Sequence, residues 1–298
     1  MKYVIINADD FGMCHSGNLA VFDLLEKGGI TSSTIMAPCA WAREAAEFAS
    51  KHPEYAIGVH LTTTSEWHNY RWAPVADGVP SLRDEEGFMW HESDQFEEHA
   101  DLAEAQKEIV AQIEKLKKFG LVPSHLDNHM GSLYGIEKGR TELLEMTLGV
   151  CAQYRLPFRI PLKFKPEQME NETLDIHVPL ELINGLFAKV NAFCEGYKVA
   201  APDYLMPGDW AGPQKDSFEN YREYIYELYR SFEDDAVTET YIHPILITEE
   251  SQAITGTWQR RNWEYRLFGD SETHKFFDSI GVKKISYRDL NRMRGFDK

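Results

Sequence analysis

Short apolar runs alternate along the chain with longer segments in which apolar residues recur every three to four positions. Such runs are typical of buried strands, and such segments are typical of helices that cover a sheet. Strands are predicted at residues 2–7, 33–36, 56–61, 124–127, 157–160, 204–206, 238–242 and 284–287. Helices are predicted at residues 16–27, 41–51, 94–119, 141–154, 180–194, 218–232, 258–267 and 272–279.

This alternation predicts an α/β fold in which seven or eight parallel strands carry their helices on the outside. Right-handed crossovers around that many units favour a (β/α) barrel-like arrangement, although a doubly wound open sheet fits the same pattern. No linker divides the chain, so we expect a single domain over residues 1–298. Residues 62–90, rich in Pro, Gly and Trp, are expected to form a long loop over one face.

The composition excludes several classes of protein. The 298 residues are 43% hydrophobic and 27% charged, so an ordinary packed core can form. Lys and Arg number 31 against 48 Asp and Glu, and the resulting net charge of −17 would repel nucleic acids and anionic membranes. We find neither a signal peptide nor the run of about 18 apolar residues that a membrane span needs. The four dispersed cysteines predict free thiols and hence a cytoplasmic protein.

Two adjacent carboxylates, Asp9 and Asp10, directly follow the first predicted strand in the motif Asn-Ala-Asp-Asp-Phe-Gly. Neighbouring side chains at a strand end point to different sides, so one carboxylate can bind a cation while the other stays free. The alternative is a turn in which an Asp caps the next helix. The position favours chemistry, because barrel active sites lie at the carboxyl ends of the strands.

Histidines stand at the ends of three further predicted strands. His60 ends the third strand and His243 ends the seventh, whereas His125, Asp127 and His129 alternate at the end of the fourth. Imidazole and carboxylate are common ligands of divalent ions, although any one of these histidines could instead be a packing residue. Because four strand ends offer such groups, the pattern indicates a metal-dependent hydrolase. The motifs of serine hydrolases, Walker-type NTPases and dinucleotide-binding proteins are absent from the sequence.

At these motifs the chain resembles the YdjC-like carbohydrate deacetylases, which are related to NodB-type polysaccharide deacetylases. The resemblance rests, in the family's order, on residues 7–12, 31–34, 57–60, 123–129, 243–244 and 286–289. It implies a (β/α) barrel-like fold and hydrolysis of an N-acetyl group from small amino sugars such as chito-oligosaccharides. The chain departs from the family just beyond His129, where residues 130–134 replace further histidines.

The resemblance also implies roles for the strand-end residues. It implies one divalent metal, with Mg²⁺ favoured and Zn²⁺ as the alternative, held by Asp10, His60 and His129. Asp9 would act as general base and His243 as general acid, and His125 and Asp127 would support the ligands. The residue types alone leave Zn, Mn, Co, Fe and Mg open.

The long loop carries the expected contacts to substrate. Trp67 and Trp72 offer aromatic faces on which sugar rings pack, and Arg71 could reach hydroxyl or acidic groups. The alternative is a loop pinned to the barrel by buried tryptophans. The expected partner is a small carbohydrate, and the oligomeric state stays open between a monomer and a homodimer. Other functions left open are a metal-dependent amidase, a phosphoesterase and a non-catalytic sugar-binding protein.

Overall fold

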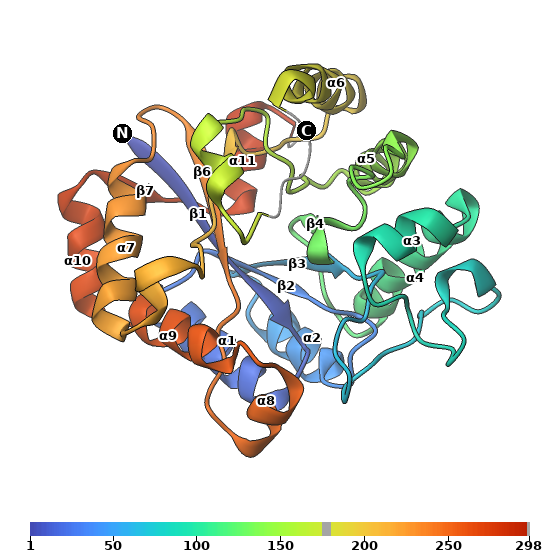
Figure 1. Ribbon diagram of the computed structural model, residues 1–298, viewed down its shortest axis with the longest axis horizontal. Coiled ribbons are helices and arrows are strands. Elements are labelled where there is room, and N and C mark those ends of the chain that lie inside the picture. Colours follow the sequence, from blue (N-terminus) through green and yellow to red (C-terminus); the bar gives the residue numbers. More distant parts are fainter. Residues whose placement is uncertain (175–179, 297–298) are drawn as a thin grey trace.

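The computed structural model describes residues 1–174 and 180–296, which fold around one parallel sheet (Figure 1). In this part of the chain the sheet has seven strands, in the order β4-β3-β2-β1-β6-β5, and β7 pairs with the start of β1. The strands are β1 (Lys2–Phe11), β2 (Ser32–Ile35), β3 (Ala56–Leu61), β4 (Leu126–Asn128), β5 (Tyr204–Leu205), β6 (Val237–Ile242) and β7 (Val282–Lys284). Every pairing is parallel, as the alternation of strands and helices predicts.

Helices surround the sheet, as Figure 1 shows. They are α1 (His15–Glu26), α2 (Ala42–Lys51), α3 (Ser93–His99), α4 (Leu102–Lys118), α5 (Thr141–Tyr154), α6 (Leu180–Tyr197), α7 (Phe218–Arg230), α8 (Glu249–Ile254), α9 (Trp258–Phe268), α10 (Ser271–Ser279) and α11 (Tyr287–Arg294). Short 3₁₀ turns lie at η1 (Pro80–Leu82), η2 (His129–Gly131), η3 (Pro166–Glu170) and η4 (Gly212–Lys215). None of the helices in the described ranges is long and apolar enough to cross a membrane.

An irregular segment spans the gap between β4 and β5. The strand predicted at 157–160 is absent there, and Phe158 makes only an isolated bridge to Leu126. The segment nevertheless donates backbone hydrogen bonds to both neighbours, from Arg159 to Leu126 and from Phe158 to Ala200. Prolines at 157 and 161 remove the N–H groups that a regular strand needs. The curved sheet is thus bridged into a barrel-like ring.

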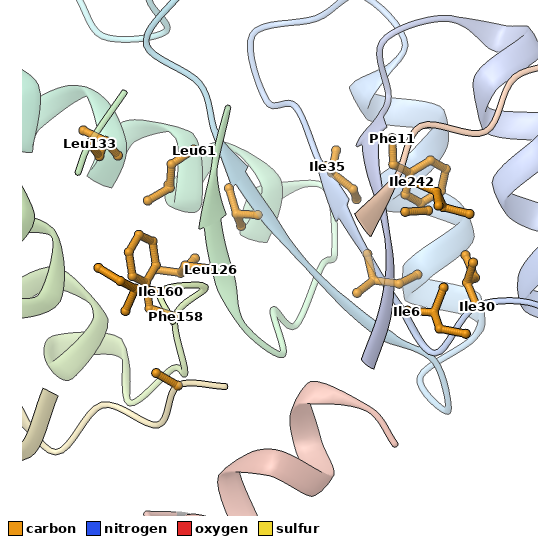
Figure 2. Packing of buried hydrophobic residues seen from close by; sticks show 14 of the residues in the cluster. Ile6, Phe11, Ile30, Ile35, Leu61, Leu126, Leu133, Phe158, Ile160 and Ile242 are labelled. Carbon is orange, nitrogen blue, oxygen red and sulfur yellow. The ribbon is translucent and has the colours of Figure 1, made fainter. Parts of the chain in front are cut away.

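The two faces of β1 divide the interior into an apolar outer layer and a polar inner one. Val4, Ile6 and Ala8 pack in the large hydrophobic cluster, part of which Figure 2 shows. Ile5, on the other face, packs in a separate cluster near the start of the strand. Toward the carboxyl end that inner face continues with Asn7 and the acidic motif, all buried. The polar site therefore lies inside the barrel, above an apolar base.

Two predicted boundaries are wrong for local reasons. The helix predicted at 94–119 is two helices, because the chain leaves α3 at Ala100 and Asp101 caps α4 by accepting bonds from the next residues. The strand predicted at 284–287 ends earlier, at Lys284. Ser286 and Asp289 form a capping box there that starts α11.

Candidate active site

The ends of β1, β3, β4 and β6 surround one cavity of about 710 Å³. Five of the residues singled out from the sequence line it together: Asp9, Asp10, His60, His129 and His243. Their convergence follows from the topology, since parallel strands bring their carboxyl ends to the same edge of the sheet. Gly58 permits the close approach of β3 and β4, because a Cβ there would lie 2.4 Å from the His125 carbonyl oxygen.

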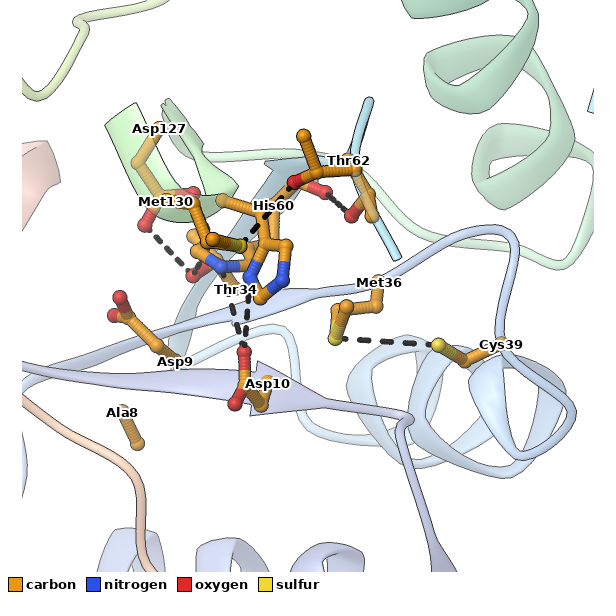
Figure 3. A network of polar contacts seen from close by, with 12 residues as sticks. Ala8, Asp9, Asp10, Thr34, Met36, Cys39, His60, Thr62, Asp127 and Met130 are labelled. Atoms are coloured by element: carbon orange, nitrogen blue, oxygen red, sulfur yellow. Dashed lines mark hydrogen bonds and ion pairs between the residues drawn. The ribbon is translucent and has the colours of Figure 1, made fainter. Parts of the chain in front are cut away.

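The two adjacent carboxylates reach the cavity together, contrary to the prediction that they point to different sides. The pairing of β1 with β2 shifts register between Ala8 and Phe11, and Asp10 has a left-handed backbone with φ of 58°. Figure 3 shows Asp9 and Asp10 on one side of the strand and Ala8 on the other. A bulge of this kind re-aims a side chain, and strained backbone is often found at functional sites.

Asp10, His60 and His129 form a compact set of candidate metal ligands. One ligand atom from each lies within 4.8 Å of the others, and all three side chains are buried. Asp10 Oδ1 is 3.5 Å from Nε2 of His60 and 3.6 Å from Nδ1 of His129. Ligand atoms about 2.0–2.1 Å from a tetrahedral metal lie about 3.3 Å apart, so these separations suit an ion between them.

Each of the two histidines is held by a carboxylate on its far side. Nδ1 of His60 lies 2.7 Å from Asp127 Oδ1, and Nε2 of His129 lies 2.9 Å from Glu66 Oε2. In the neutral rings these bonds place the proton on the outer nitrogen, so both inner lone pairs face Asp10. Metal-binding histidines typically have such carboxylate partners, which fix the tautomer and the orientation of the ring.

The electrostatics of the set also favour a cation. Burial lowers the pKa of His60, but the carboxylates of Asp127, Asp10 and Asp9 together outweigh it and the pKa is raised to about 10. In the same way burial opposes Glu66 at His129, whose pKa is raised to about 9. The acids thus draw positive charge to this point, whether as protons or as an ion.

The strongest evidence that a metal fits this site comes from one carboxylate oxygen of Asp10. Asp10 Oδ1 is buried and accepts no hydrogen bond from any residue that the structure describes. Its partner Oδ2 accepts one from Arg261 at 2.7 Å, and although burial would raise the pKa of Asp10, the guanidinium keeps it well below its usual range. An ionised buried oxygen that faces two imidazole nitrogens needs a cation, so the residues fit a divalent metal.

Asp9 belongs to a different network, centred on the buried Arg159. The guanidinium binds Asp9 in a fork, with Nη1 at 2.6 Å and Nη2 at 2.7 Å. The same group contacts Asp127 at 3.1 Å and Glu239 at 2.8 Å. Asn7 donates to Asp9 Oδ1 at 2.8 Å. These donors use three of the roughly four lone-pair positions of the Asp9 carboxylate, which leaves one on Oδ2 facing the cavity.

His125 and Asp127 both lie behind the ligands, at different distances from them. Asp127 touches His60 directly and also accepts a hydrogen bond from Thr34 at 2.8 Å. His125 instead donates from Nε2 to Asn7 Oδ1 at 3.1 Å, and its ring stacks on Tyr287. Burial lowers the pKa of His125 to about 3, so the ring is neutral. It supports the ligands only through Asn7.

His243 faces the cavity from the end of β6. Its backbone N–H donates to Glu264 at 2.7 Å, and its ring meets Tyr241 edge to face at 5.6 Å. The imidazole makes no hydrogen bond to the rest of the described chain. Burial, with Arg261 nearby, lowers the pKa of His243. The ring is therefore free to contact a bound molecule.

Comparison with known proteins identifies the family of this chain. A family model described as YdjC-like protein matches residues 3–279. The chain belongs to the YdjC-like family. The resemblance predicted from the strand-end motifs is therefore confirmed.

Relatives of this YdjC-like protein are described as carbohydrate deacetylases. One from Geobacillus stearothermophilus is 31% identical over 178 residues, which cover 60% of this chain and 66% of that protein. One from Enterococcus faecalis is 37% identical over 161 residues, covering 53% and 58%. The chain thus spans less than two thirds of the length of these two relatives. A third, from Listeria welshimeri, is 26% identical over 290 residues and covers 96% and 99%.

A solved structure supports the fold. The crystal structure of a protein from Enterococcus faecalis V583, named for a proposed cleavage of cellobiose phosphate, matches with a TM-score of 0.73 and 28% identity. The match covers 97% of this YdjC-like chain and 98% of that one. The predicted (β/α) barrel-like fold is confirmed.

Four residues of this YdjC-like site escaped the sequence analysis. Arg159 carried a local signal, since a single charge inside an apolar, proline-flanked run needs a buried partner. Glu66, Arg261 and Glu239 carried no such signal. A single charged residue in a loop, on a helix or in a strand is common in any sequence and does not by itself indicate a functional site. Each acquires its role from a partner far along the chain, such as Asp10 for Arg261.

The loop residues predicted to border the substrate lie differently. Among the described residues, those that line the cavity include Glu66 from this loop but not Trp67, Arg71 or Trp72. Arg71 bonds Asp84 at 2.6 Å and the Met89 carbonyl, and Trp72 is buried. Trp67 lies 5.5 Å from the guanidinium of Arg261. The geometry favours a pinned loop, and contact of these three residues with substrate stays a prediction.

Proposed function

We propose that this YdjC-like protein is a metal-dependent carbohydrate deacetylase that removes the acetyl group from small N-acetylated amino sugars. One observation carries the proposal: two histidine lone pairs and the unpaired Oδ1 of Asp10 converge beside a second, separately held carboxylate, Asp9. Amide hydrolysis needs this combination of an electrophilic centre and a nearby proton acceptor.

The metal would be held by Asp10, His60 and His129. When bound, it would supply Lewis acidity toward a carbonyl oxygen and toward the attacking water. The family resemblance favours Mg²⁺, whereas two imidazole nitrogens among three ligands suit Zn²⁺ better than Mg²⁺, which prefers oxygen. The choice between Mg²⁺ and Zn²⁺ is therefore part of the test.

Asp9 is the proposed general base. Arg159 and Asn7 hold its carboxylate in one orientation and leave the remaining position on Oδ2 for the proton of a water molecule. Because Arg159 also binds Asp127, the base and the support of His60 are positioned by one side chain. The geometry of the base and that of the ligand set are thereby coupled.

His243 is the proposed general acid. Its ring lines the same cavity from just beyond the end of β6, and its nitrogens make no hydrogen bond to the rest of the described chain. An amide nitrogen is a poor leaving group until it gains a proton, and imidazole is the usual donor near neutral pH. Since burial lowers the pKa of His243, the ring must gain its proton during the reaction.

The structure favours a deacetylase over a phosphoesterase. Arg159 and Arg261 are the two Arg or Lys side chains among the described residues that line the cavity, and buried carboxylates bind both. The second acidic cluster, Asp9, His60 and Asp127, shares His60 with the first, and Arg159 already binds both of its acids. A second metal, as many phosphoesterases use, therefore lacks a free ligand set here.

The test is a substrate screen on chelator-treated protein reloaded with Mg²⁺ or Zn²⁺ separately. Acetate release is measured from N,N′-diacetylchitobiose and from an aryl acetamide. Phosphate release is measured from an aryl phosphate ester. We expect release from the sugar with one of the metals and none after chelation. Faster cleavage of the phosphate ester would refute the proposal, as would undiminished activity after chelation. Metal binding without any turnover would indicate the non-catalytic sugar-binding alternative.

A further inference from the structure

The cavity extends beyond the polar site into a region with apolar walls, here called the apolar arm. Six residues define it: Leu144, Ile160, Phe164, Ile183, Leu186 and Phe187. They come from α5, from the segment before η3 and from α6. The whole cavity, at about 710 Å³, falls within the range of about 300–1,000 Å³ in which proteins hold drug-sized ligands.

The walls of the apolar arm are held by hydrogen bonds of their own. The backbone N–H of Leu162 donates to the Pro202 carbonyl at 3.0 Å, and Asn191 of α6 donates to the Leu162 carbonyl at 2.8 Å. Gln168, in η3, donates to the Leu205 carbonyl at 2.8 Å. These bonds tie the segment before η3 to α6 and to the sheet, so the arm is a built part of the cavity.

The arm offers little to a sugar hydroxyl. Of the polar side chains beside it in the described chain, Gln168 both donates to Leu205 and accepts from the Lys165 N–H, Thr173 lies within hydrogen-bond distance of Asp209 and Arg260, and Glu172 is exposed. A hydroxyl group placed there would lose its bonds to water without replacement. An alkyl or aryl group placed there would instead leave water for an apolar surface.

We propose that the apolar arm binds an apolar substituent of the substrate, and the proposal rests on the proposed deacetylase function. The preferred substrates are then N-acylated amino sugars that carry an alkyl or aryl group, rather than unsubstituted oligosaccharides. Two parts of such a molecule can supply that group: an apolar aglycone on the anomeric carbon or an N-acyl chain longer than acetyl. The arm continues from the site that holds the amide, so either can reach it.

The test compares specificity constants, kcat/KM, within two substrate series. The first series is the methyl and n-butyl β-glycosides of N-acetylglucosamine, and the second is the N-acetyl and N-hexanoyl forms of the methyl glycoside. Full burial is worth about fourfold per methylene, so the three more carbons of the n-butyl group correspond to at most about 60-fold and the four more carbons of the hexanoyl group to at most about 200-fold. We expect at least a tenfold gain, mainly through KM, in one series, and that series identifies the source of the apolar group.

Variants show whether the arm causes the gain. Leu186→Asn introduces an amide with the same number of side-chain heavy atoms at a part-buried wall position and should lower the ratio between long and short substrates severalfold. Ala188→Asn introduces the same amide at an exposed position of α6 and should keep the wild-type ratio. Circular dichroism of both variants confirms that α6 is intact.

Two kinds of failure are distinguishable. Ratios near one in both series, or an unchanged ratio in Leu186→Asn, would overturn the apolar arm while leaving the deacetylase intact. No turnover of any substrate with either metal would refute the proposed function instead. In that case calorimetric binding of the long and short members of both series still decides the arm, since equal affinities within each series would overturn it.

Discussion

Replacing Arg159 with methionine removes the one positive charge that three buried carboxylates share. The side chain is 3% exposed and contacts Asp9, Asp127 and Glu239 within 3.1 Å. Methionine keeps much of its length and none of its charge. We expect Arg159→Met to fold with much reduced stability and to lose the orientation of Asp9, the proposed general base.

The magnitude follows from the burial of the partners. Breaking a buried ion pair costs about 3–5 kcal/mol, because the remaining charge is left uncompensated. Arg159 has three such partners, so the upper part of this range is expected. With an unfolding entropy of about 2.1 cal/mol/K per residue, each kcal/mol lowers the melting temperature of this 298-residue chain by about 1.6 °C, so the upper part of the range predicts a loss of about 6–8 °C near neutral pH.

The loss should depend on pH in a defined direction. In the wild type, burial raises but Arg159 lowers the pKa of Asp127, to about 2, so its stabilisation is present above about pH 4 and is lost as the pH falls toward 2. Glu239, whose pKa burial raises to about 7 despite Arg159, costs stability as the pH rises from about 4 through 7. Without Arg159 both values rise, so the variant should lose more stability between pH 5 and pH 8 than the wild type.

The assay is thermal and urea unfolding at pH 5, 7 and 8, with Arg222→Met as a control on the surface of α7. Arg159→Lys retains the charge without the fork and should recover part of the stability. Arg159→Met/Glu239→Gln removes one uncompensated acid and should be more stable than the single variant at pH 8. If Arg159→Met lost less than about 1 kcal/mol and showed no added pH dependence, the network would not stabilise the fold and this reasoning would be wrong.

Three further predictions concern the site itself. His60→Ala or His129→Ala should remove most bound metal while the chain still folds, with a lower melting temperature in His60→Ala because the buried Asp127 loses a partner; full occupancy by elemental analysis would contradict the ligand assignment. Because the pKa values of His60 and His129 are raised to about 10 and 9, metal binding near pH 7 should release about two protons. Calorimetry in buffers of different ionisation enthalpy would measure the number of protons released. The affinity for the metal should rise as the pH rises. Asp9→Asn should retain metal and lose about 10²–10⁴-fold in kcat. His243→Ala should slow cleavage of an amide far more than cleavage of an activated aryl ester. Equal losses of rate on the two substrates would remove His243 from the acid role.

Much of the site could be predicted because its main residues are marked locally. Asp10, His60 and His129 each stand near the carboxyl end of a predicted strand, and the order of strands and helices places such ends together. The apolar runs were readable because strands of a parallel sheet are buried on both faces. The prediction that Asp9 and Asp10 point apart was wrong, because a register shift in β1 cannot be seen from local alternation.

The sequence by itself thus determined the family, the alternation of strands and helices, and which side chains stand at the strand ends, since these depend on residues near one another in the chain. Tertiary structure alone decided which charges meet. Arg159 reaches Asp9 across 150 residues and Arg261 reaches Asp10 across 251. It also left Asp10 Oδ1 without a hydrogen-bond partner among the described residues and placed the apolar arm beside the polar site. Such pairings depend on how strands and helices pack across the barrel. A local pattern of hydrophobic and polar residues does not specify which residues far apart in the chain come into contact.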